Sequence, residues 1–159
     1  MSVRAGIGYD SHRFAEGRPL VLGGVEVPSD RGLHGHSDAD VLTHAVIDAL
    51  LGAAGLDDIG THFPDTDERW RDADSIALLE EARSLLDSAG VAPVGVDTVL
   101  ICEAPRLGPF RRAMEERLAA AAGLEPGSVN VKFTTNEGMG FVGRGEGIAA
   151  LATATVERE

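Results

Sequence analysis

The chain has 159 residues, of which 43% are hydrophobic and 25% are charged, so its composition is that of a globular protein rather than a disordered or membrane-embedded one. Its 14 basic and 26 acidic residues give a net charge of −12, which disfavours nucleic-acid and membrane partners because both select basic surfaces. The single cysteine, Cys102, excludes an internal disulfide and favours a reducing, cytoplasmic location. We expect no signal peptide, no membrane span and one domain over residues 1–159.

The predicted elements mix strands and helices without strict alternation, which favours an α+β fold. In chain order they are a strand over 3–9, a hairpin over 20–27, a helix over 38–54, a polar loop over 57–74, a helix over 75–89, a strand over 94–102, a helix over 110–122 and strands over 129–135 and 148–156. Gly23-Gly24 suits the hairpin turn, and Gly55 and Gly123 suit helix ends. Either Ser37 or Asp38 could cap the first helix.

Two groups of residues suggest a metal site. Asp10 and His12 lie two positions apart on a predicted strand, so their side chains project to the same side. Asp40, His44 and Asp48 are spaced four apart, which places them in one polar stripe on an otherwise apolar helix. Together Asp10, His12 and His44 form an O,N,N ligand set that suits zinc with a fourth position left open, as in catalytic sites.

Polar residues also surround the start of that helix. A helix start offers free N–H groups for a phosphate, although capping alone would explain Ser37, and His36 has no such simple explanation. In the polar loop, carboxylates of the stretches 58–60 and 63–67 could bind sugar hydroxyls or only solvate the loop, and composition does not decide between these.

The C-terminal region combines Thr135 and Glu137 with a run of glycines. Hydroxyl groups and backbone donors can hold phosphate oxygens, and Glu137 can hold a magnesium ion that bridges them. Residues 138–143, GMGFVG, match the dinucleotide-binding fingerprint letter for letter. That fingerprint must open a helix within a strand–helix–strand unit, and the chain ends too soon after it, so we interpret the match as accidental.

Five stretches together resemble one family, the 2-C-methyl-D-erythritol 2,4-cyclodiphosphate synthases of non-mevalonate isoprenoid biosynthesis. They are GIGYDSHRF (6–14), HSDADVLTHAVIDALLGAAGLDDIGTHFPDTD (36–67), ADS (73–75), EAPRLGP (103–109) and TTNEGMGFVGRGEGIAA (134–150). The resemblance implies a β-sheet covered by helices on one face, and a homotrimer whose sheets face the threefold axis and whose active sites lie between subunits. It implies a lyase that converts 4-diphosphocytidyl-2-C-methyl-D-erythritol 2-phosphate to the cyclic diphosphate and releases CMP.

The same resemblance implies roles for individual residues. Asp10, His12 and His44 would bind one zinc ion per subunit, Glu137 a magnesium or manganese ion held with the substrate diphosphate, and His36 and Thr135 would support the transition state. The implied substrate-binding residues are Ser37, Asp58, Ile59, Gly60, Phe63, Pro64, Asp65, Thr66, Asp67, Cys102, Glu103, Ala104, Pro105, Arg106, Leu107, Gly108, Thr134, Asn136, Phe141 and Arg144. Arg144 and Glu146 would lie near the threefold axis, and Tyr9 and Phe141 would line the adjacent cavity.

Three positions depart from the family's usual residues. Arg71 and Arg106 stand where lysine is usual, which keeps the charge but changes the donor geometry, and Asn136 replaces a frequent threonine. These changes bear on the nucleotide contacts rather than on the reaction.

Two other classes of function fit parts of the pattern. A zinc phosphoesterase would use the same ligands but give linear products. A metal-stabilised trimeric binding module would bind zinc without turnover, and it would call for a complete ligand set rather than three ligands with a vacancy.

Overall fold

The computed structural model describes residues 1–159. Its central feature is a five-stranded sheet with the strand order β4-β1-β7-β5-β6. The strands are β1 (Ser2–Ala15), β2 (Leu20–Leu22), β3 (Val25–Val27), β4 (Gly32–Leu33), β5 (Val91–Ile101), β6 (Val129–Thr134) and β7 (Gly147–Arg158). The helices are α1 (Val41–Ala54), α2 (Ile59–His62), α3 (Ser75–Ser88), α4 (Arg111–Ala122) and α5 (Gly140–Gly143), with 3-10 turns η1 (Glu68–Trp70) and η2 (Gly108–Phe110). Only β5 and β6 pair in parallel, joined through α4.

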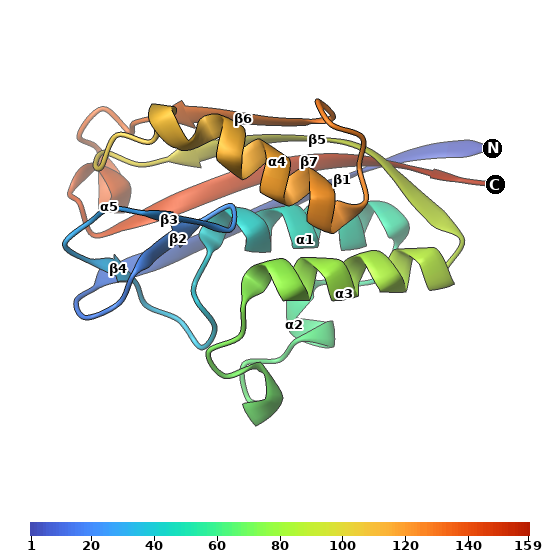
Figure 1. The fold of residues 1–159 in the computed structure, drawn as a ribbon, viewed down its shortest axis with the longest axis horizontal. Coiled ribbons are helices and arrows are strands. Elements are labelled where there is room, and N and C mark those ends of the chain that lie inside the picture. Colours follow the sequence, from blue (N-terminus) through green and yellow to red (C-terminus); the bar gives the residue numbers. More distant parts are fainter.

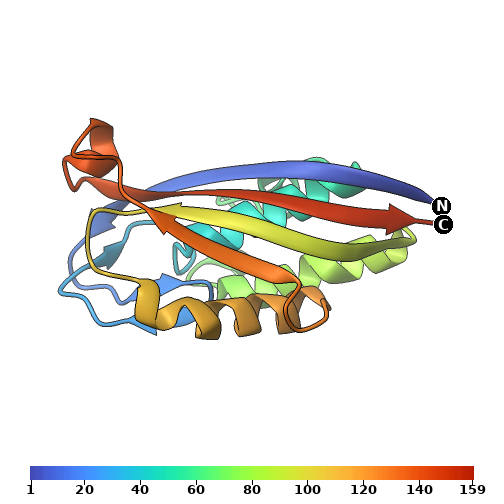
Figure 2. The same ribbon diagram turned by 90° about the horizontal axis from the view of Figure 1, so that it is seen from above.

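Helices α1, α3 and α4 lie on one side of this sheet, as Figures 1 and 2 show. The opposite side carries exposed apolar side chains, among them Ile7 (70% exposed) and Tyr9 (54% exposed) on β1. The prediction of an α+β sheet covered by helices on one face is confirmed. The two termini lie side by side because Ser2 pairs with Arg158 (Figure 1). No helix combines the length and apolar character that crossing a membrane requires.

Local sequence signals set the limits of α1. Its N-cap is Asp40, whose carboxylate accepts a hydrogen bond from the N–H of Thr43, and it ends at Gly55, which adopts a left-handed conformation. The prediction that Ser37 or Asp38 caps this helix is therefore wrong. Asp40 also accepts hydrogen bonds from the N–H groups of Gly23 (2.8 Å) and Gly24 (2.7 Å), so the turn of the β2–β3 hairpin is held against the helix start.

Two glycines allow α1 to lie unusually close to β1. A Cβ added at Gly8 would lie 2.0 Å from the carbonyl oxygen of Ala45, and one at Gly6 would lie 2.2 Å from that of Ala49. Ala45, Ala49 and Ala53 recur at four-residue spacing, so the helix presents its smallest side chains to the strand. This close approach determines how far His44, next to Ala45, lies from the strand.

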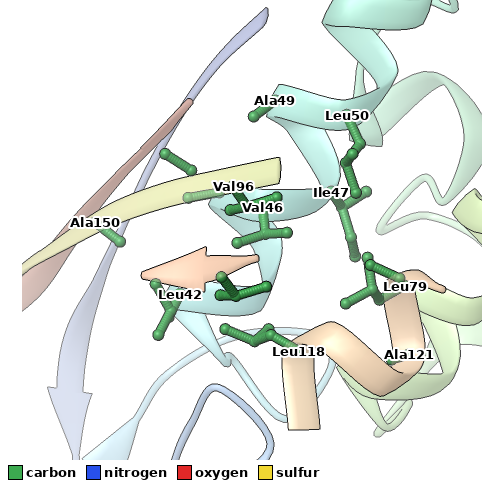
Figure 3. Packing of buried hydrophobic residues seen from close by; sticks show 14 of the residues in the cluster. Leu42, Val46, Ile47, Ala49, Leu50, Leu79, Val96, Leu118, Ala121 and Ala150 are labelled. Carbon is green, nitrogen blue, oxygen red and sulfur yellow. The ribbon is translucent and has the colours of Figure 1, made fainter. Parts of the chain in front are cut away.

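The core lies between the sheet and the helices as one cluster of 39 buried residues. Figure 3 shows Leu42, Val46 and Ile47 of α1 packed towards Leu118 and Leu79 of the other two large helices. Helix α1 is buried nearly all round, which explains why its sequence is almost continuously apolar.

The remaining elements differ from the sequence predictions mainly in extent. Strand β1 continues to Ala15 instead of ending at Tyr9, since β7 pairs with it as far as Arg13 and β4 pairs with its last two residues. The polar loop over 57–74 contains α2 and η1, and β4 and α5 were not predicted. Within the GMGFVG stretch only the four-residue α5 forms, and it leads into β7, which is antiparallel to β5; the match to the dinucleotide fingerprint is thus accidental.

Candidate metal centre and substrate pocket

Three side chains from two elements meet at one end of the sheet. Asp10 and His12 project from β1 towards α1, on the same side as Gly6 and Gly8, and His44 meets them from the first turn of α1. Asp10 Oδ2 lies 2.8 Å from His12 Nε2 and 3.1 Å from His44 Nδ1. One ligand atom from each of the three lies within 4.8 Å of the others, a spacing that can hold a metal ion. The predicted triad is therefore brought together.

The hydrogen bonds on the far side of each ring test whether a cation fits. His12 Nδ1 lies 2.8 Å from the carbonyl oxygen of His34, which can only accept, so Nδ1 carries a proton. His44 Nε2 lies 2.7 Å from Ser75 Oγ. With those nitrogens protonated, the neutral rings turn the lone pairs of His12 Nε2 and His44 Nδ1 towards the same carboxylate oxygen. Such an arrangement can accept a cation between them, and an O,N,N set with oriented imidazoles fits a divalent ion such as zinc.

Without a metal, protons supply that positive charge, and the ionisation of the triad reflects it. Burial by itself raises the pKa of Asp10, but hydrogen bonds and charge interactions with His12 and His44 outweigh it and lower the pKa to about 2. Burial by itself lowers the pKa of His12, but its hydrogen bond with Asp10 and the charge of that carboxylate raise the pKa above its usual 6.5. A divalent ion would have to displace a proton held at this position.

The triad opens into a cavity of about 530 Å³, within the size range of small-molecule sites. The predicted site residues that line it are Asp10, His12, His36, Ser37, His44, Ile59, Gly60, Phe63, Pro64 and Asp65. Ser37 Oγ accepts a hydrogen bond from the N–H of Ala39 and lies 3.2 Å from His44 Nε2, so its own proton is free to be donated into the cavity.

Three predicted residues of the polar loop do not line the cavity, and two of them cap short helices instead. Asp58 caps α2 and accepts hydrogen bonds from the N–H and the hydroxyl of Thr61, which lower the pKa of its carboxyl group. Asp67 caps η1 and pairs with Arg69, and its carbonyl oxygen lies 3.1 Å from His36 Nε2. Thr66 is exposed and is not part of the lining.

The other predicted residues form a second group where β5 and β6 end. Glu103 accepts a hydrogen bond from the N–H of Asn136 (2.7 Å), which ties the 102–108 loop to the 134–137 loop. Thr135 Oγ1 accepts a hydrogen bond from the N–H of Glu137 (3.2 Å), whose side chain is exposed. The remaining members of this group are Cys102, Ala104, Pro105, Arg106, Leu107, Gly108 and Thr134, of which Cys102 and Leu107 are buried.

One chain does not bring the two groups together. Ser11 on β1, Ala149 on β7, Ile101 on β5 and Thr134 on β6 lie in one row across the sheet. Three strand spacings separate the ends of this row, which is about 14 Å. The metal triad and the second group therefore lie at the same end of the sheet but at different strands.

Residues near the C-terminal turn line a second cavity beside the triad. Arg144 donates a hydrogen bond to Glu146 (2.7 Å) on the surface, and Phe141 lines this cavity together with Phe14, Glu146 and His12. Tyr9 borders the cavity of the metal triad in one chain, and its expected place with Phe141 in a cavity near the threefold axis stays a prediction. Arg71 is exposed and pairs with Glu68.

The sequence reasoning missed several residues of the cavity and misread one. His34, Gly35, Trp70 and Leu78 line the cavity, and no motif singled them out. Asp48 also lines it and accepts a hydrogen bond from the N–H of Ile59 (3.0 Å), so the polar stripe on α1 was the signal that could have placed it there. Asp40 of the same stripe is a fully buried helix cap rather than part of the site.

The chain is similar to known proteins along nearly its whole length. The model of the YgbB family matches residues 3–157. A 2-C-methyl-D-erythritol 2,4-cyclodiphosphate synthase from Rubrobacter xylanophilus is 63% identical over 158 residues, covering 98% of this chain and 95% of the relative.

Solved structures give the same result. The bifunctional IspDF from Campylobacter jejuni superposes with a TM-score of 0.95 at 40% identity, over 99% of this chain and 43% of that longer chain. A 2C-methyl-D-erythritol-2,4-cyclodiphosphate synthase in a CDP-bound form superposes with a TM-score of 0.88 at 41% identity, over 97% of this chain and all of that one.

Proposed function

The chain belongs to the YgbB family, and on that premise we propose that it converts 4-diphosphocytidyl-2-C-methyl-D-erythritol 2-phosphate to 2-C-methyl-D-erythritol 2,4-cyclodiphosphate, releasing CMP, in isoprenoid precursor biosynthesis. The observation that carries the proposal is the Asp10, His12 and His44 triad, which opens into a cavity edged by His36 and Ser37. The 159 residues would act as one catalytic domain, supported by the single hydrophobic cluster.

The proposed reaction joins two ends of one substrate molecule. An oxygen of the 2-phosphate forms a bond to the β-phosphorus of the CDP group while the bond from that phosphorus to the bridging oxygen breaks, and CMP leaves with this oxygen. The nucleophile is already ionised, so no strong general base is needed. Holding both ends in one cavity supplies much of the rate, because the attack is intramolecular.

The residues around the triad would bind and orient the phosphates. We assign zinc to Asp10, His12 and His44, and a magnesium or manganese ion to Glu137 together with the substrate diphosphate. These ions, when bound, would offset the negative charge that the phosphate oxygens carry and develop. The free hydroxyl proton of Ser37 would be donated to a phosphate oxygen, and the ring of His36, whose Nε2–H donates to the carbonyl oxygen of Asp67, would line the cavity next to it.

A homotrimer would complete the site. In one chain β1, which carries Asp10 and His12, and the end of β6, which Thr135 and Glu137 follow, are three strand spacings or about 14 Å apart, so we propose that the second group of one subunit faces the triad of its neighbour. The uncovered sheet face supports this, since exposed Ile7 and Tyr9 would be buried around a threefold axis. The 102–108 loop would then bind the cytidine and its phosphates, in line with the relative whose structure contains CDP. We place the protein in the cytoplasm, where its single free thiol, that of buried Cys102, would stay reduced.

Phosphorus NMR of the purified protein with the proposed substrate, zinc and magnesium tests the reaction. We expect a cyclic diphosphate signal and an equal amount of CMP, and no turnover by His44→Ala. CMP with only linear phosphates would show a hydrolase on the same scaffold. Unchanged substrate in a zinc-loaded trimer would instead favour a binding module and refute the proposed activity.

A further inference from the structure

A serine at the start of α3 contacts the triad through the ring nitrogen of His44 that faces away from Asp10. Ser75 is the first residue of α3, is completely buried, and has its Oγ 2.7 Å from Nε2 of His44. The same hydroxyl group forms a short hydrogen bond to Oδ1 of Asp38. A buried hydroxyl between an imidazole and a carboxylate has both partners fixed, so the direction of each hydrogen bond can be worked out.

The directions follow from counting protons. Asp38 accepts hydrogen bonds from the N–H of Asp40 (3.1 Å) and the N–H of Ser75 (3.0 Å), one on each carboxylate oxygen, so it acts as an acceptor. The hydroxyl group has one proton, and it is donated to Asp38. Its oxygen is then left to accept from His44 Nε2, which must carry the proton of that ring.

This arrangement fixes both the tautomer and the orientation of His44. With the proton on Nε2, the lone pair is on Nδ1, the nitrogen that lies 3.1 Å from Asp10 Oδ2. The segment that carries Asp38 is also held against the start of α3, since Asp38 N–H donates to the carbonyl oxygen of Ala73 (3.1 Å) and Asp72 N–H donates to that of His36 (2.8 Å).

We propose that Ser75 and Asp38 are positioning residues for the metal site, which act through His44 and touch neither metal nor substrate. They hold His44 in the tautomer that binds a divalent ion through Nδ1, and they couple the ligand to the start of α3. The inference rests on the proposed metal-dependent function. Partners of this kind typically change metal affinity by about 10- to 100-fold when removed.

The test compares Ser75→Ala with Ser84→Ala, a matched control on the exposed side of the same helix. Zinc affinity is measured by competition with a chromophoric chelator. We expect the dissociation constant of Ser75→Ala to rise by at least about 10-fold and that of Ser84→Ala to stay unchanged. A second variant, Asp38→Asn, should also weaken zinc binding, and the double variant should lose less than the product of the two, because both act through one hydrogen-bonded chain.

A spectroscopic measurement separates positioning from a general loss of packing. In metal-free protein at pH 8.5, ring ¹⁵N shifts should place the proton of His44 on Nε2 in the wild type and on both nitrogens in exchange in Ser75→Ala. Wild-type zinc affinity in both Ser75→Ala and Asp38→Asn, or an unchanged tautomer in Ser75→Ala, would overturn the inference. If the wild type itself binds no zinc, the proposed metal dependence fails, and the inference fails with it.

Discussion

Replacing Gly8 with alanine should disturb the metal site from a position that touches neither metal nor substrate. The added Cβ would lie 2.0 Å from the carbonyl oxygen of Ala45, whereas an ordinary contact begins at 3.4 Å. Strand and helix must therefore separate locally by about 1.4 Å, the difference between these two distances. The obstructing atoms belong to backbone, so no side-chain rotation can relieve the clash.

Two consequences of Gly8→Ala can be given magnitudes. Overpacking of this kind destabilises by about 1–3 kcal/mol, and the backbone clash places this variant at the upper end. His44 precedes Ala45 and moves with the helix, while Asp10 stays on the strand, so the distance between Nδ1 and Oδ2 changes from 3.1 Å. Metal sites tolerate deviations of only about 0.2 Å, and we expect zinc affinity to fall by on the order of 100-fold.

Urea unfolding and chelator competition measure the two effects. Gly52→Ala is the matched control: it makes the same chemical change on the exposed side of α1, where the nearest atom, Ile7 O, would lie 3.9 Å from the new Cβ. Because alanine favours a helix over glycine, this control should gain about 0.5–1 kcal/mol and keep its zinc affinity. Wild-type stability and zinc affinity in Gly8→Ala would show that the close approach does not set the ligand geometry.

Three further predictions follow from buried groups. Burial raises the pKa of the Cys102 thiol to about 11, so alkylation by iodoacetamide at pH 8 should be at least about 100-fold slower in native than in urea-unfolded protein; equal rates would refute this burial. Because the pKa of His12 is raised in the folded protein, His12 stabilises the metal-free fold below pH 6.5, and this stabilisation is lost as the pH rises through the pKa of the folded state. The lowered pKa of Asp10 also stabilises the fold, but that stabilisation is lost only as the pH falls from 3.8 towards 2. Metal-free protein should therefore resist urea better at pH 6 than at pH 8.5, and zinc should reverse this pH dependence by displacing the proton. Asp10→Asn should abolish the pH dependence; if Asp10→Asn leaves it unchanged, the pKa shift of His12 is not caused by Asp10. Asp40→Asn should lower the free energy of unfolding by about 2–4 kcal/mol in urea melts, because an amide nitrogen cannot accept two of the four hydrogen bonds that this carboxylate receives, and a loss under 1 kcal/mol would contradict that role.

Local sequence patterns determined most of the secondary structure. Gly23-Gly24 fixes the hairpin turn and Gly55 fixes the end of α1, because both positions require left-handed backbone that glycine adopts freely. The spacing of Asp10 and His12 placed both on one side of a strand, since side chains in strands alternate. These features depend on residues close in sequence, so they could be predicted without the fold.

Only the tertiary structure decided which residues from distant segments of the chain contact one another. Asp40 had a helical spacing that suited the site, yet it caps α1 because the β2–β3 hairpin packs against that helix start. Ser75 belongs to a stretch that carries the resemblance, but nothing in the sequence indicated its contact with His44, because that contact joins residues 31 positions apart through the packing of α3 on α1. The sequence by itself supplied the candidate ligands Asp10, His12 and His44, and the close packing of α1 on Gly8 brings the three together at one point, since contact between distant segments depends on packing rather than on local preference.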